Sequence, residues 1–285
     1  MTESDGNASS YSPWSDVFGF SWLGFYASFS QSLFKYWQEL LSVEKPDWQS
    51  ENIVVLEAEA FKLRRFTPKR SGPPMLILGP QAGHHSCITD YALPGQSLVA
   101  LCKNNTQCTI YAVEWKSADP SRSHETIDDL VKQVSDCVNF IGDKVHIIGL
   151  CQAGWLSSIY ASLYPGKVLS LILGGAPIDF TAGGGKLQEM VQNLPMSFYR
   201  SMVQMGLGVM KGNFIVTGFK NMNPYDRYVG DYLKLFANIN EPNPTTLLML
   251  HEGPQASISF YVTSGLDGFG SVSSLPVRLA FPAFA

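Results

Sequence analysis

Short apolar runs alternate with longer amphipathic stretches through the middle of the chain. Four of these runs predict strands, and they cover residues 75–78, 109–113, 145–150 and 168–173. The fully apolar run at 75–78 and the run at 145–150 predict buried strands. Helical patterns at 94–101 and 124–140 separate the first three runs. Strands that alternate with helices predict an α/β fold whose parallel strands lie side by side.

The pattern differs before this alternating region. Residues 14–43 carry aromatic side chains at helical spacings, which predicts an amphipathic helix that lies on the domain or on an apolar surface. A membrane span over residues 17–34 is the alternative, because that stretch has no charge, although its serines dilute the hydrophobicity. Residues 52–66 alternate apolar and polar positions and predict one or two strands.

The pattern also changes beyond residue 174, where glycines follow the last apolar run and a helical, methionine-rich stretch begins. We expect that stretch to be a cap over the core, because methionine-rich helices are typical of cores and lids. The predicted division has four parts, which are a polar tail with the aromatic helix (1–50), an α/β core (51–180), a helical cap (181–252) and an atypical tail (253–285).

Composition excludes several classes of protein. With 45% hydrophobic and 15% charged residues, the 285-residue chain is globular, and its net charge of −4 gives no basic field for nucleic acid. Five cysteines without a C-x-x-C pair indicate neither a disulfide framework nor a metal site. The first sixteen residues have no Lys or Arg, so no signal peptide is expected. Reduced thiols then indicate a cytoplasmic protein.

One short stretch, Val145–Trp155, carries the candidate chemistry. Its apolar run breaks at Gly149, presents Cys151 and continues at once into helix-favouring residues, which is the layout of a nucleophile elbow. Gly149 and Ala153 leave room for a tight turn, and Gly154 leaves room for the helix to pack on the strand. The N-terminus of that helix favours a thiolate and anionic intermediates. A small buried cysteine with no chemical role is the alternative.

The elbow and four other segments, in the same order, resemble polyhydroxyalkanoate synthases and intracellular poly(3-hydroxybutyrate) depolymerases. The other segments are the loop 80–86, the stretch Asp90–Leu98, the strand end Val113–Ala118 and the strand end Leu173–Phe180. The resemblance covers about residues 50–250. It implies an α/β-hydrolase-like, mostly parallel sheet with a helical cap insertion. It also implies acyl transfer or (thio)ester cleavage on 3-hydroxyacyl substrates through a cysteine, without a cofactor.

Two departures from that family bear on activity. Ala153 stands where the synthases have glycine, which crowds the turn slightly. The family carries its catalytic Asp and His on loops after the last two strands, but this sequence has no histidine after His251, and residues 253–285 do not resemble the family. We therefore expect the last strands to be missing or replaced and the catalytic activity to be impaired.

Acyl transfer through a thiol needs a nucleophile, a base and donors for the oxyanion. Cys151 is the candidate nucleophile. The backbone amides of Gln152 and Ala82 are the candidate oxyanion donors, because one donor follows the nucleophile and the other comes from the loop after the first parallel strand. Gln81 and His84 on that loop are candidate substrate-binding residues, and a purely structural turn is the alternative for the loop.

The acid and the base are weaker hypotheses. His85 lies on the loop that passes beside the elbow in this fold, so it is the candidate base, although the family takes its base from elsewhere. Asp179 follows the strand after the elbow, where some hydrolases place the acid of the triad. An Asp stands near this position in the synthases without being their catalytic acid, so a structural role is the alternative.

Two functions therefore remain open. The first is an enzyme of polyhydroxyalkanoate metabolism that acts through Cys151 on a small-molecule or polymer substrate. The second is a non-catalytic remnant or a granule-associated binding protein, with residues 14–43 as a contact to a granule or membrane surface. Sequence patterns do not separate synthase from depolymerase, because both use a cysteine-type elbow here.

Overall fold

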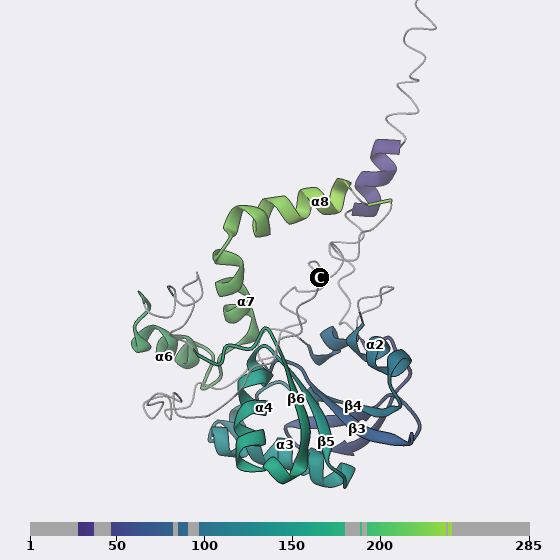
Figure 1. Ribbon diagram of the computed structural model, residues 1–285. Coiled ribbons are helices and arrows are strands. Elements are labelled where there is room, and N and C mark those ends of the chain that lie inside the picture. Colours follow the sequence, from purple (N-terminus) through teal and green to yellow (C-terminus); the bar gives the residue numbers. More distant parts are fainter. Residues whose placement is uncertain are drawn as a thin grey trace, which may run out of the picture.

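The protein is built on a six-stranded mixed sheet. The structure, a computed structural model, describes residues 28–36, 47–81, 85–90, 97–179, 189, 193–237 and 239–240. The strands lie in the order β1-β2-β4-β3-β5-β6 (Figure 1). Their bounds are β1 Ile53–Glu57, β2 Phe61–Arg65, β3 Gly72–Leu78, β4 Cys108–Trp115, β5 Val145–Leu150 and β6 Val168–Gly174.

The two halves of the sheet differ in direction. The antiparallel hairpin β1–β2 joins the sheet antiparallel to β4, whereas β4, β3, β5 and β6 run parallel to one another. The four predicted parallel strands are therefore confirmed as neighbours, with β5 inside the sheet between β3 and β6. This strand order and the mostly parallel pairing make the fold α/β-hydrolase-like, as predicted.

Helices cover both faces of the sheet because the side chains of each strand alternate between them. Leu76 and Leu78 pack toward α3 (Ile127–Ile141) and α4 (Gln152–Leu163). Met75 and Ile77 pack on the opposite face with residues of α2 (Leu98–Asn105). Figure 1 shows α3 and α4 together on one side of the sheet. This double cover explains why β3, β4 and β5 are apolar runs without alternation.

The parallel strands end at a common level. Leu78 on β3 lies opposite Val113 on β4 and opposite Gly149 on β5, and Gly149 in turn lies opposite Leu173 on β6. Residues that follow these four positions therefore meet at one edge of the sheet, its carboxyl edge, where α/β folds place their ligand sites.

Helical elements follow β6, as the predicted cap requires. They are α6 (Met196–Met205), α7 (Gly212–Asn221), a π-helical turn η4 (Asp226–Gly230) and α8 (Asp231–Ala237). Residues 28–36 are also helical, and Phe29 and Tyr36 pack edge-on against Phe236 of α8. The rest of the predicted aromatic helix and the tail 253–285 lie outside the described residues, and the four-part division of the chain stays a prediction.

The helix predicted over 94–101 differs in position. Helix α2 spans Leu98–Asn105, because the Ser97 hydroxyl accepts the backbone N–H of Ala100 at 2.8 Å and caps the first turn. Three short 3-10 turns complete the connections, and they are η1 (Ser86–Thr89), η2 (Pro120–Arg122) and η3 (Pro165–Lys167).

Candidate active site at the nucleophile elbow

Cys151 occupies the tight turn between β5 and α4. Its backbone has φ 50° and ψ −119°, a region that residues with a side chain rarely adopt. Two hydrogen bonds hold the turn, since the Cys151 N–H donates to the Gly174 carbonyl at 2.8 Å and the Gly154 N–H donates to the Cys151 carbonyl at 2.9 Å. The Cys151 side chain makes no capping bond to α4. The predicted elbow geometry is therefore present.

Glycine is required on both sides of the cysteine by close approach of other atoms. A Cβ on Gly149 would lie 2.5 Å from the Ser157 hydroxyl and 2.9 Å from the Ala153 carbonyl oxygen. A Cβ on Gly154 would overlap the Cβ of Ala176, which follows β6. Helix α4 thus packs against the sheet so closely that a methyl group fits at neither glycine.

Cys151 is the exposed thiol of this protein, and the other four cysteines are buried. Burial, together with the charges of Asp47, Glu114 and Asp90, raises the pKa of Cys87 to about 12. Burial likewise raises the pKa of Cys102 and of Cys137. Because the thiolate is the reactive form, buried thiols with a raised pKa are inert, and reagents in water meet Cys151 first.

The oxyanion candidates are placed in part. Gln152 is the first residue of α4, so its backbone N–H lies at the positive end of the helix dipole beside Cys151. Gln81, three residues beyond β3, is buried. Ala82 and His84 lie outside the described residues. The roles proposed for all four stay predictions.

His85 lies beyond the loop after β3 and packs toward β4. Its Nδ1 accepts the backbone N–H of Cys87 at 3.2 Å, which caps η1, and its Nε2 lies 3.8 Å from Oε1 of Glu114. Asp179 lies exposed beyond the end of β6. The structure brings Gln152 to Cys151 and brings Glu114 to His85. A base role for His85 and an acid role for Asp179 stay predictions.

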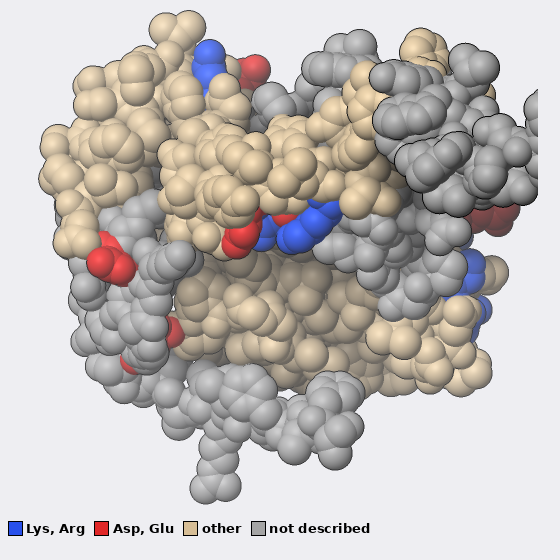
Figure 2. Space-filling model, turned by 90° about the horizontal axis from the view of Figure 1, so that it is seen from above, with Lys and Arg blue, Asp and Glu red and all other residues tan. Residues whose placement is uncertain are grey.

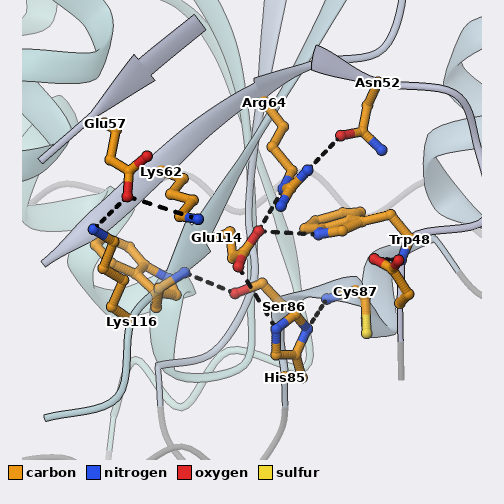
Figure 3. A network of polar contacts seen from close by, with 12 residues as sticks. Trp48, Asn52, Glu57, Lys62, Arg64, His85, Ser86, Cys87, Glu114 and Lys116 are labelled. Carbon is orange, nitrogen blue, oxygen red and sulfur yellow. Dashed lines mark hydrogen bonds and ion pairs between the residues drawn. The ribbon is translucent and has the colours of Figure 1, made fainter. Parts of the chain in front are cut away.

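Glu114 belongs to a polar network that sequence reasoning missed (Figure 3). Its Oε2 accepts hydrogen bonds from Arg64 Nε and from the Trp48 indole, the latter at 3.2 Å. Burial acts to raise the pKa of Glu114, but the hydrogen bond and charge of Arg64, helped by Trp48 and His85, outweigh burial and lower it. Arg64 and Trp48 lie 50 and 66 positions from Glu114. The sequence signal for this network was Glu114 itself, an acidic residue near the end of a strand. Neither Arg64 nor Trp48 lies near Glu114 in the sequence.

A second missed cluster surrounds Asp90, which is fully buried. Its Oδ2 accepts the backbone N–H groups of Gln49 and Ser50 at 3.0 and 2.7 Å. Its Oδ1 accepts the hydroxyls of Ser50 and Ser97 at 2.8 and 2.7 Å. Asp90 therefore ties the segment before β1 to the start of α2.

The described residues contain neither a metal-binding cluster nor a membrane-spanning helix. No group of three or more His, Cys, Asp or Glu side chains within them is arranged to hold a metal ion. In the same part of the chain, every helix is too short or too polar to cross a membrane.

Comparison with known proteins places the chain in a family. A family described as "Protein of unknown function (DUF3141)" matches residues 55–249. The chain belongs to this family. The match begins within β1 and extends past α8, so the matched residues of this DUF3141 chain include the elbow and the helices after β6.

Several curated relatives are called poly(3-hydroxyalkanoate) polymerase subunit PhaC. That of Synechocystis sp. is 36% identical over 142 residues, which are 46% of this chain and 36% of the relative. That of Haloferax mediterranei is 30% identical over 138 residues, 46% of this chain and 27% of the relative. That of Thiocystis violacea is 28% identical over 140 residues, which are 47% of this chain and 38% of the relative. The chain thus spans between about a quarter and two fifths of these relatives. The predicted resemblance to polyhydroxyalkanoate synthases is confirmed.

Solved structures resemble the DUF3141 chain more distantly. A hydrolase from Pseudomonas aeruginosa has a TM-score of 0.41 and 14% identity, and the match covers 73% of this chain and 74% of that one. Carboxylesterase CesB from Bacillus subtilis has a TM-score of 0.33 and 19% identity, and the match covers 52% of this chain and 50% of that one. The fold assignment rests on the strand order and the elbow described above.

Proposed function

We propose that this chain carries the acyl-transfer centre of an enzyme of polyhydroxyalkanoate metabolism, with Cys151 as the nucleophile. The observation that carries the proposal is an exposed thiol on a strained, positive-φ turn between β5 and α4. Such a turn lifts the reactive atom above the carboxyl edge of the sheet and next to the helix N-terminus. The relatives named PhaC supply the substrate class, a 3-hydroxyacyl thioester or its polymer.

In the proposed reaction the Cys151 sulfur attacks the thioester carbonyl carbon, and the carbonyl oxygen becomes an oxyanion. The backbone N–H of Gln152 and that of Ala82 stabilise the oxyanion. Collapse of this intermediate breaks the carbon–sulfur bond of the substrate, so that a thiolate leaves and takes up a proton while the acyl group stays on Cys151. The oxygen of a hydroxyl group or water then attacks the acyl carbon and gives its proton to a base, and the bond to the Cys151 sulfur breaks, which releases the ester or acid and restores the Cys151 thiolate.

The second half of this reaction depends most on the base. Nδ1 of His85 accepts the Cys87 N–H and its Nε2 faces Glu114, so neither nitrogen is poised for a proton of the nucleophile. General acid–base help is worth about 10²–10⁴ in rate. We therefore propose that this chain accepts an acyl group on Cys151 and turns over slowly, with Asp179 as the acid if a base is supplied.

Mass spectrometry of the full chain tests this function. The chain is incubated with a 3-hydroxybutyryl thioester and the mass of the intact protein is followed, with peptide mapping of the adduct and a steady-state assay of thiol release. We expect one hydroxyacyl group on Cys151 and little turnover. The adduct is expected to vanish in Cys151→Ala and to persist in the matched control Cys102→Ala, because Cys102 is buried.

Alkylation by iodoacetamide separates a folded but inert protein from a misfolded one. We expect Cys151 to be alkylated faster than the four buried cysteines. If Cys151 is alkylated in this way yet never carries an acyl group, the proposed function is wrong. Fast turnover that depends on Cys151 would instead show that a base is supplied within the chain.

Binding without catalysis is the second candidate, and the apolar surface of the cap helices favours it. Leu207, Tyr225 and Leu233 are 81%, 69% and 60% exposed, and Phe34 in the helix packed on α8 is 71% exposed. Figure 2, seen from above in the orientation of Figure 1, shows few charged side chains on that face. A binding protein would co-sediment with polymer granules in both wild type and Cys151→Ala, and neither would form the adduct.

A further inference from the structure

The loop after β3 is clamped at both ends to the end of β4. Where the loop leaves the sheet, the Gly79 carbonyl accepts the Trp115 indole N–H at 2.9 Å. Where it returns, the Ser86 hydroxyl accepts the Trp115 backbone N–H at 2.9 Å. Trp115 and Ser86 are buried, so water does not compete for these bonds. Both ends of the loop are therefore held by β4.

That loop starts beside the elbow. Leu78, the last residue of β3, lies opposite Gly149, two residues before Cys151. Leu78 also lies opposite Val113, one residue before Glu114. The start of the loop after β3, the elbow and Glu114 therefore share the carboxyl edge of the sheet, and the start of the loop lies between the other two.

His85 is the residue on which the returning end of the loop depends. Because its Nδ1 accepts the Cys87 N–H, the ring proton of neutral His85 is on Nε2, which faces Oε1 of Glu114 at 3.8 Å. The two side chains are only 10% and 12% exposed, so the charge of Glu114 acts on the ring with little screening. Figure 3 shows the ring between η1 and the carboxylate.

The carboxylate is itself held from β2 and from the segment before β1. Arg64 donates to Glu114 and, through its Nη1, to Oδ1 of Asn52 at 2.6 Å, and its guanidinium lies 5.6 Å from the centre of the Trp48 ring. The Trp48 indole donates to the same Glu114 oxygen. With Oε2 fixed in this way, Oε1 is left aimed at His85. The negative charges of Asp47 and Asp90 also act close to His85, because both help to raise the pKa of Cys87, two residues along the chain.

We propose that Glu114 is a positioning residue of the elbow site: it fixes the orientation of His85 and thereby holds the returning end of the loop after β3 at the carboxyl edge of the sheet, which also carries Cys151. This proposal rests on the acyl-transfer function proposed above. It gives His85 a different task from the base, because a ring that caps η1 through Nδ1 and faces Glu114 through Nε2 orients the end of the loop without touching the substrate.

Glu114→Gln tests the proposal in the full chain, because glutamine keeps the size and loses the charge. We expect acylation of Cys151 by the 3-hydroxybutyryl thioester to slow by about tenfold, since small misplacements of positioning groups have effects of that order or larger. Glu114→Asp is expected to recover part of the rate. Glu57→Gln is the matched control, because Glu57 pairs with Lys62 and Lys116 on the surface and not with His85.

Titration of the histidines by NMR supplies a readout that a purely structural role would not move. Loss of a neighbouring carboxylate disfavours the imidazolium, so the pKa of His85 is expected to fall in Glu114→Gln and to stay unchanged in Glu57→Gln. The proton exchange and chemical shifts of Nε2 are expected to change with it. This measurement needs no substrate, so it tests Glu114 even if Cys151 proves inert.

Failures of the two proposals differ. If wild-type protein forms no acyl adduct, the acyl-transfer function is wrong, whatever Glu114 does. If wild type acylates and Glu114→Gln acylates equally fast, or if the His85 titration is the same in both, the positioning role is wrong.

His85→Asn provides a second route if Glu114→Gln fails to fold. Asparagine can still cap η1 but cannot reach Glu114 through a second ring nitrogen. It is expected to slow acylation as much as Glu114→Gln does, and the double variant is expected to be no slower than either single one. Additive losses would contradict a shared mechanism.

Discussion

At the scale of single residues, the elbow depends on a missing methyl group. We expect Gly154→Ala to lower the free energy of unfolding by about 2 kcal/mol, because the added Cβ would overlap the Ala176 Cβ. The gain of about 1 kcal/mol that alanine offers within a helix is smaller than this overlap costs. Urea unfolding followed by circular dichroism measures the change.

The same crowding supplies a compensating variant. Ala176→Gly removes the opposing methyl group and is expected to restore most of the stability of Gly154→Ala. Gly166→Ala is the control, because a Cβ at Gly166 meets nothing within 4 Å, so its stability should stay within about 0.5 kcal/mol of wild type. A Gly154→Ala protein as stable as this control would mean that α4 can move away from β6.

Residues differ in how far the sequence alone predicts them. The elbow was predictable, because Gly149, Cys151 and Gly154 are consecutive parts of one local turn. The networks of Glu114 and Asp90 were not predicted, because Trp48 and Arg64 lie 66 and 50 positions from Glu114, and Gln49 and Ser50 lie 41 and 40 positions from Asp90. Only the pairing of β2 with β4 brings Arg64 to Glu114, and no local pattern encodes that pairing.

At the scale of elements, the first turn of α3 has a capping box. The Thr126 hydroxyl accepts the Asp129 N–H at 3.4 Å, and the Asp129 carboxylate accepts the Thr126 N–H at 2.8 Å. We expect Thr126→Ala to lower the free energy of unfolding by about 1 kcal/mol and Thr126→Ser to leave it nearly unchanged. Urea unfolding at pH 7 measures both. A Thr126→Ala protein as stable as wild type would show that packing alone holds this helix end.

The effect should depend on pH with a defined sign. The hydrogen bonds from Thr126 lower the pKa of Asp129 below its usual 3.8, so the folded protein binds this proton less readily than the unfolded chain. The contribution of the box is therefore complete above pH 3.8 and is lost as the pH falls through the lower, folded value. The difference between wild type and Thr126→Ala should shrink in that window.

The same helix shows what periodicity predicts. Its apolar period predicted a helix over 124–140, and two of the apolar positions in that period, Val131 and Val134, are buried in α3. The period says little about the first residue, because the cap is polar and lies outside the repeat. Thr126 therefore sets the start at Ile127, three residues later than predicted.

At the scale of the whole molecule, Asp90 joins segments that no strand pairing connects. We expect Asp90→Ala to lower the free energy of unfolding by about 3 kcal/mol or more, since two backbone N–H groups and two hydroxyls lose a buried acceptor. Asp90→Asn should cost less, because its oxygen can accept the two N–H groups and its NH₂ can donate to the hydroxyls of Ser50 and Ser97. Urea unfolding of both variants measures the difference. Equal losses would indicate that the charge, and not the hydrogen bonds, matters at Asp90.

The whole fold was more predictable than its edges. Alternation of apolar runs and helices predicted the four parallel strands, because burial on both faces leaves a strong apolar signal. Edge strand β6 carries a mixed pattern of burial, with Leu169 and Ile172 exposed, yet its sequence resembles that of the buried strands. A run of apolar letters identifies a strand and does not say how much of the strand is covered.

The bonds of Trp48, Ser50 and Gln49 also decide where the chain can be trimmed for expression. The family match begins at residue 55 and β1 begins at Ile53, so either position is a natural choice for a first residue. Both choices would remove the Trp48 indole, which packs on Phe66 and donates to Glu114. They would also remove Gln49 and Ser50, whose backbone N–H groups donate to Asp90. A fragment intended to fold should therefore start no later than Asp47, since the hydrogen bonds extend the domain beyond its first strand.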